Sequence, residues 1–342
     1  MQRKHSDEFS SSHSLMLRHR CQKDLVPEDQ KLKKFLPLAK YSVAVLILYF
    51  IASYVLRNLD QISFTDLRFD FSSLTLSVVF LLVYILGNAL TWHFITVKAG
   101  IGLSLAQALK LWVYSLAAKY VPGKVLSFSI LILSYKAAGA SVKKISLCLF
   151  LESACAVLAN VFVMLLAFLM TDLGEFEGYK PLAVVVTVCL LLILHPRVLQ
   201  PLANLGLKVL RQEPVDLAIP YASVLLATLQ YILAFLMLGV GLCFFMASFY
   251  EVQIEHFLYI TGSVALAGLI GQFALFVPSG LGVREGVLVL MLSRLMPHPM
   301  AGLVSILSRL WITVGEMIVV LGVLIHAKFW GRLDSVQTDK YR

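Results

Sequence analysis

The chain has 342 residues and a formal net charge of +9; apolar residues make up 59% of it and charged residues 14%. Soluble domains average about 45–50% apolar and about 25% charged residues. A water-soluble fold of this length could not bury so much apolar surface, which excludes a soluble enzyme and indicates one multi-span membrane domain. We expect no nucleic-acid partner.

Residues 1–37 are polar and lack a short apolar segment followed by a small-residue cleavage site, so they do not resemble a cleavable signal peptide. We expect them to form a cytosolic tail. A membrane-surface role for the tail lysines (Lys31, Lys33 and Lys34) is the alternative.

The apolar runs that follow are of two kinds. A spanning helix needs about 20 mostly apolar residues, and we expect six crossings, at 38–56, 74–97, 144–171, 180–196, 218–246 and 300–328. The other apolar pieces form two pairs, 104–118 with 124–135 and 257–277 with 283–296. The shorter pieces would reach only about 18–23 Å as helices, which suits arms of re-entrant hairpins.

A proline and one or more glycines interrupt each pair. The first break reads VPGK at 121–124 and the second reads VPSGLG at 277–282. Proline and glycine break helices, and such breaks occur at membrane depth where protein surrounds the backbone. We therefore predict one re-entrant hairpin over 104–135 and another over 257–296.

The distribution of charge predicts the sidedness. With a cytosolic N-terminus, the inner segments hold 18 basic residues, whereas the outer segments hold three basic and eight acidic residues. This bias follows the positive-inside rule. It does not test the hairpins, since a fully crossing hairpin would leave the parity unchanged.

The two halves of the chain share an order of two helices, a hairpin and one helix. Three crossings per half would make the halves inverted relative to each other, a recurring transporter design. The expected fold is an all-α integral membrane protein with about six transmembrane helices and two re-entrant hairpins in an inverted repeat. The domain would cover 38–328, with repeats at about 38–171 and about 180–328, before a cytosolic tail at 329–342.

The hairpin tips are candidate anion sites. A helix that begins inside a membrane presents unpaired N–H groups and the positive end of its dipole. The candidate substrate-binding residues there are Lys119, Gly123, Lys124, Pro278, Gly280, Gly282, Arg284 and Glu285. Gly280, Gly282 and Gly286 would let a ligand approach the backbone. The alternative is that the glycines only permit tight packing and that the cations reach toward headgroups.

Three further charges lie inside predicted spans: Glu152, Arg309 and Glu316. Charge there is costly and usually faces a partner or a wet cavity. If the repeats superpose, we expect Glu152 to pair with Arg309. A structural ion pair that fixes helix register is the alternative reading.

The sequence contains none of the motifs GxSxG, HExxH or P-loop, and no Cys/His spacing typical of a zinc site. We expect no catalytic residue, metal or cofactor.

Family resemblance is carried by KYVPGK at 119–124, by Gly139 and Ser141 with Glu152, and by VPSGLGVREG at 277–286. Together they resemble the membrane (flippase) domain of bacterial lysylphosphatidylglycerol synthases and its stand-alone relatives, over most of 38–328. The resemblance implies lipid flipping without the aminoacyl-lipid chemistry, which belongs to a separate domain of the synthases. Ser279 stands where the family often has glycine. Stand-alone relatives are often linked to glycolipid or polyprenyl-phosphate pathways, so the substrate does not follow from the resemblance.

We expect a flippase that moves an anionic, phosphate-bearing lipid, glycosylated or polyprenyl, with its headgroup between the hairpin tips. The alternatives are a secondary transporter of a small soluble anion, a membrane enzyme that uses a lipid-phosphate donor, and a non-transporting partner of a lipid-modifying pathway. The expected location is the bacterial cytoplasmic membrane with both termini cytosolic. A lipid-modifying enzyme or glycosyltransferase is the expected protein partner, and the sequence leaves the oligomeric state open.

Overall fold

A computed structural model describes residues 69–118, 124–171, 180–193, 219–274 and 282–339, with a few single positions between them. This part of the chain is helical and contains no strand. Five of its helical segments are long and apolar enough to cross a membrane: Phe71–Lys98, Val142–Leu169, Tyr221–Ala247, Ile254–Phe273 and His298–Ile325. The expectation of an all-α membrane protein is confirmed at this level.

The helices are α3 (Phe71–Lys98), α4 (Leu105–Ala118), α5 (Lys124–Ala137), α6 (Val142–Leu169), α7 (Lys180–Ile193), α9 (Tyr221–Ala247), the 3-10 turn η4 (Ile254–His256), α10 (Phe257–Phe273), α11 (Val283–Leu292) and α12 (His298–Asp339). The crossing expected at 38–56 lies outside the described residues. The crossing expected at 180–196 corresponds to α7, which is described over 14 residues.

Both predicted helix breaks are present. Helix α4 ends at Ala118 and α5 begins at Lys124, and α10 ends at Phe273 well before α11 begins at Val283. The residues of the VPG and VPS segments themselves lie outside the described residues. Together with η4, α10 is long enough to count as a span, so length alone does not decide whether this segment re-enters or crosses.

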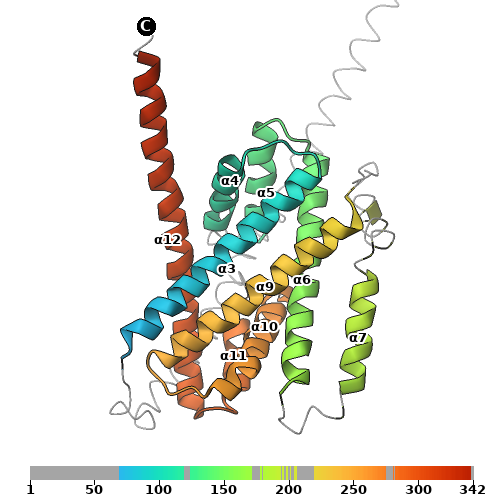
Figure 1. The fold of residues 1–342 in the computed structure, drawn as a ribbon, viewed down its shortest axis with the longest axis vertical. Coiled ribbons are helices and arrows are strands. Elements are labelled where there is room, and N and C mark those ends of the chain that lie inside the picture. Colours follow the sequence, from blue (N-terminus) through green and yellow to red (C-terminus); the bar gives the residue numbers. More distant parts are fainter. Residues whose placement is uncertain are drawn as a thin grey trace, which may run out of the picture.

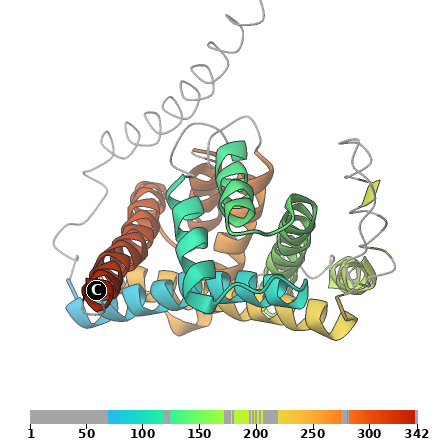
Figure 2. The same ribbon diagram turned by 90° about the horizontal axis from the view of Figure 1, so that it is seen from above.

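Two long helices organise the bundle. Helices α3 and α9 run antiparallel and side by side along one face (Figures 1 and 2). Helices α4 and α5 lie at the end of the bundle where α3 ends, whereas α10 and α11 lie at the opposite end, where α9 ends (Figure 1). The short helices therefore occupy opposite ends of the molecule.

The helix contacts define two apolar cores. Helix α6 packs against α5, α9 and α10, and α12 packs against α11, α3 and α4. One core joins α10, α11 and α12 to the first half of α3 and the second half of α9. The other joins α5 and α6 to the opposite halves of α3 and α9. Trp112 and Phe235 pack against both cores and mark their boundary.

A buried polar contact lies inside the second core. The indole Nε1 of Trp92 donates to the hydroxyl of Tyr135 at 2.8 Å, and both side chains are fully buried. Their rings meet edge to face with centroids 5.7 Å apart. This contact ties α3 to α5, so it positions the second arm of the first helix pair.

The start of α3 is tied to the end of α9. Asp70 accepts hydrogen bonds from the backbone N–H groups of Ser72 at 2.9 Å and Ser73 at 3.2 Å, which caps the first turn of α3. The backbone N–H of Asp70 donates to the carbonyl of Ser248 at 2.9 Å.

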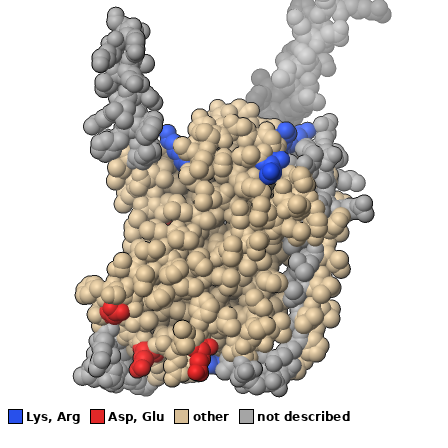
Figure 3. All heavy atoms as spheres, viewed as in Figure 1, with Lys and Arg blue, Asp and Glu red and all other residues tan. Residues whose placement is uncertain are grey.

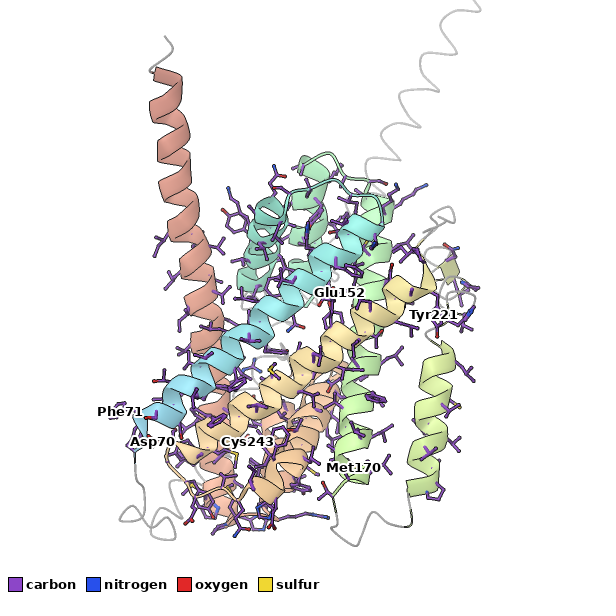
Figure 4. All side chains as sticks on the ribbon, viewed as in Figure 1. Asp70, Phe71, Glu152, Met170, Tyr221 and Cys243 are labelled. Carbon is purple, nitrogen blue, oxygen red and sulfur yellow. The ribbon has the colours of Figure 1, made fainter. Side chains whose placement is uncertain are left out.

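Charged side chains gather at the two ends of the molecule. Figure 3 shows lysines and arginines at one end, mainly acidic residues at the other, and an uncharged belt between them. The basic end is where α3 finishes at Lys98 and α6 begins with Lys143 and Lys144. The acidic end is where α3 starts after Asp70 (Figure 4).

Candidate functional site

The most compact group of charges lies where α11 meets α12. Glu285 Oε1 lies 3.6 Å from Arg309 Nη1, and the exposed fractions of their side chains are 2% and 18%. Sequence analysis selected both residues, and the structure brings them together. The ion pair joins α11 to α12, two helices of the second half of the chain. The expected partner of Arg309 was Glu152, in the first half.

Glu285 also caps the helix on which it lies. Its Oε2 accepts a hydrogen bond from the backbone N–H of Gly282 at 2.5 Å, and its carbonyl accepts one from Ser305 Oγ at 2.9 Å. Among the described residues, Glu285 Oε1 has no hydrogen-bond partner, and the ion contact with Arg309 compensates its burial. A buried carboxylate left without that contact would be costly.

Glycines set the backbone before α11. Gly280 and Gly282 have φ angles of +64° and +82°, where residues with a Cβ are strained. A Cβ on Gly280 would lie 2.5 Å from the carbonyl oxygen of Gly271, and a Cβ on Gly271 would lie 3.1 Å from Cβ of Arg284. Gly271 of α10 therefore lets the turn and Arg284 pack closely. Sequence reasoning missed this glycine, although it ends a series of glycines along α10 (Gly262, Gly268 and Gly271).

Gly286, which was expected to let a ligand approach the backbone, has open space around it. It lies inside α11, and nothing would be within 4 Å of a Cβ placed on it. No close approach of the surrounding protein therefore requires a glycine at this position.

Arg284 is a second cation beside the first. It lies in the electrostatic field of Arg309 and Glu285, and also of Tyr84 on α3 and Glu316 on α12. Among the described residues no carboxylate lies within 4.0 Å of its guanidinium group. Glu316 is buried, with an exposed fraction of 5%. Groups of α3, α11 and α12 thus act electrostatically on Arg284, which has no ion pair within the described part of the chain.

Glu152 lies on α6 and takes a different partner from the one predicted. The hydroxyl of Tyr231 on α9 donates to Glu152 Oε1 at 3.4 Å. Figure 4 shows Glu152 where α6 passes α9. The predicted Glu152–Arg309 pair is therefore wrong, because Arg309 faces α11 and Glu152 faces α9.

Most of the candidate residues between α4 and α5 lie outside the described residues. Lys119, Gly123 and Pro278 lie outside the described residues, and only the backbone of Lys124, as the first residue of α5, lies within them. Their roles as headgroup ligands stay predictions. Within the described part of the chain, no group of three His, Cys, Asp or Glu side chains could hold a metal ion.

Comparison with known proteins adds no family to this geometry. No model of a protein family matches the chain, and no curated protein matches it significantly.

Proposed function

We propose that this protein is a lipid translocator, not an enzyme, and that it holds the phosphate of an anionic lipid headgroup at the N-terminal end of α11. The observation that carries the proposal is Arg284. It lies beside Arg309 and has no carboxylate within 4.0 Å among the described residues. Next to it, the first N–H groups of α11 lack acceptors within their own helix.

Depth supports a role in crossing the bilayer. At a rise of about 1.5 Å per residue, Arg309 lies roughly 17 Å along α12 from its start. The hydrocarbon core is about 30 Å thick, so the Arg284–Glu285–Arg309 group would lie near its middle. A headgroup held there would be halfway across, while its chains stayed in the lipid.

The helix contacts support the inverted repeat. Exchanging α3 with α9, α4 with α10, α5 with α11 and α6 with α12 turns each inter-helix contact of this set into another contact of the same set. The contact of α6 with α10, for example, becomes that of α12 with α4. In this arrangement the short helix pairs are the two re-entrant hairpins, one entering from each end of the bundle.

Charge supports the orientation. The end that carries Lys98, Lys143 and Lys144 would face the cytosol, and the end that carries Asp70 would face outward. The resemblance to the synthase flippase domain favours the same function, and it favours a bacterial cytoplasmic membrane as the location. A lipid-modifying enzyme or glycosyltransferase would supply or consume the lipid.

The test uses purified protein in liposomes with a fluorescent anionic phospholipid in both leaflets. Addition of a membrane-impermeant reductant would quench only outer-leaflet dye, so translocation appears as loss beyond about half of the signal. We expect Arg284→Ala to abolish this extra loss and Arg294→Ala, which removes an exposed arginine just after the same helix, to retain it. Uptake of radioactive phosphate without lipid movement would instead favour a soluble-anion transporter.

A further inference from the structure

The contact between Tyr231 and Glu152 has a counterpart elsewhere in the chain. The segment Leu82–Leu86 of α3 reads LVYIL, and the segment Leu229–Leu233 of α9 reads LQYIL. Tyr84 and Tyr231 are therefore equivalent positions of two helices that the contact pattern relates to each other. The sequence match is independent of the helix contacts and points to the same repeat.

Each of these tyrosines lies beside ionisable residues of the other half of the chain. Tyr84 lies in the electrostatic field of Arg284 and Glu316, whereas Tyr231 donates its hydroxyl hydrogen to Glu152. The two polar sites differ in composition. The first holds two arginines together with Glu285 and Glu316, whereas the second holds a carboxylate with no cation within 4.0 Å among the described residues.

Glu152 lies as deep as the arginines. It is about 15 Å along α6 from Val142 at the basic end, whereas Arg309 is about 17 Å along α12 from His298 at the acidic end. The side chain is half-buried. A carboxylate at this depth is expected to face a partner or a water-filled path. The hydrogen bond that Glu152 makes within the described part of the chain, at 3.4 Å, is long.

The groups around Glu152 favour binding of a proton over binding of a metal cation. The ionisable groups that face it are Tyr231 from α9, Tyr135 from α5, and Cys148 and Cys155 from α6 itself. A hard metal cation needs a shell of several oxygen ligands, which two phenols and two thiols do not supply. A proton needs only one carboxylate oxygen.

We propose that Glu152 is a proton-binding site and that proton movement through it is coupled to translocation of the headgroup held at Arg284. The carboxylate takes up a proton from one aqueous side at a carboxyl oxygen and releases it to the other side. Tyr231 links this step to α9, and thus to the half of the chain that carries Arg284. The coupling rests on the proposed function, whereas proton binding by Glu152 does not.

Infrared difference spectroscopy of the protein in liposomes tests proton binding directly. A pH step should change the carbonyl stretch of a protonated carboxyl group in the unaltered protein. We expect Glu152→Gln to remove this band and Glu251→Gln, which alters an exposed carboxylate, to retain it. Tyr231→Phe should shift the band, and Tyr84→Phe should leave it in place. A band pattern unaffected by Glu152→Gln overturns the proposal.

The lipid assay with an imposed pH gradient tests the coupling. Translocation by the unaltered protein should accelerate with a gradient of one direction, and translocation by the Glu152→Gln variant should lose that dependence. A rate in the unaltered protein that ignores both directions of the gradient overturns the coupling. Absence of any lipid movement contradicts the proposed function and with it the coupling, and the infrared band then still decides whether Glu152 binds a proton.

Discussion

Arg309 of α12 forms its ion pair with Glu285 of α11 at 3.6 Å, and the other oxygen of the same carboxylate caps α11 through the N–H of Gly282. Glu285 therefore connects α11 both to the turn that precedes it and to the long helix α12. Arg284, the residue before Glu285, has no ion pair among the described residues. We infer that Glu285 and Arg309 hold the site, and that Arg284 is the cation available to a ligand.

Removing Arg309 should destabilise the protein more than removing the charge of Glu285. Arg309→Gln leaves a buried carboxylate without its partner, which typically costs about 3–5 kcal/mol. Glu285→Gln removes the charge but keeps an oxygen that can accept from Gly282. Thermal unfolding in detergent micelles measures both, and the double variant should cost less than the two single costs added together. Strict additivity would show that the pair is not coupled.

Gly280 and Gly286 should respond in opposite directions to replacement by alanine. Gly280 has φ +64°, and its added Cβ would lie 2.5 Å from the Gly271 carbonyl oxygen. We expect a cost of at least about 1–3 kcal/mol for Gly280→Ala. Gly286 lies inside a helix with open space around it, so Gly286→Ala should be neutral or stabilise by up to about 1 kcal/mol. Equal melting temperatures for the two variants would contradict this geometry.

Sequence reasoning succeeded where the physical cause is local. A proline next to glycine is a local signal that ends a helix, and the breaks after Ala118 and Phe273 lie where these positions predicted. It failed for contacts that depend on which helices lie side by side. The pairing of Glu152 with Tyr231 and of Arg309 with Glu285 depends on how each helix is rotated, which an almost uniformly apolar sequence does not encode.

The residues that sequence reasoning missed lie within apolar helical segments, where they do not stand out. Gly271 lies in an apolar run, and its role appears only when the Gly280 turn is brought against it. Tyr84 and Tyr231 read as ordinary aromatic residues of membrane helices. Their repeated LxYIL context was a signal in the sequence, and it gains meaning from the antiparallel packing of α3 on α9.

Tyr135→Phe should weaken the second core. The variant leaves the fully buried indole N–H of Trp92 without its acceptor. Hydrogen bonds between membrane helices average about 0.6 kcal/mol and reach about 1.7 kcal/mol, and burial of both partners places this one toward the upper value. Tyr114→Phe, at a more exposed position of α4, is the matched control and should leave the melting temperature unchanged. A comparable loss in both variants would contradict a specific role for the Trp92 contact.

Single cysteines at Lys144 and Glu251, in a variant whose native cysteines are replaced by serine, should label from opposite sides of the membrane. Lys144 lies at the start of α6 at the basic end, whereas Glu251 follows α9 at the acidic end. A membrane-impermeant maleimide added to intact cells should react with a cysteine at position 251 and spare one at position 144. Labelling from the same side would contradict antiparallel spans, and the reverse pattern would invert the orientation.

Asp70 should make the first turn of α3 sensitive to acid. The hydrogen bond from the Ser73 hydroxyl, followed by those from the Ser72 and Ser73 backbone N–H groups, lowers the pKa of Asp70 below its ordinary value of 3.8. Because the pKa is lower in the folded protein, the cap stabilises fully above the ordinary value and is lost as the pH falls through the lower, folded value. Hydrogen exchange at the amides of Ser72 and Ser73 should therefore accelerate, relative to amides in the middle of α3, only below about pH 4. Asp70→Asn, which keeps an acceptor oxygen but cannot ionise, should remove this acid step. An acid step of equal size in Asp70→Asn would assign it to another group.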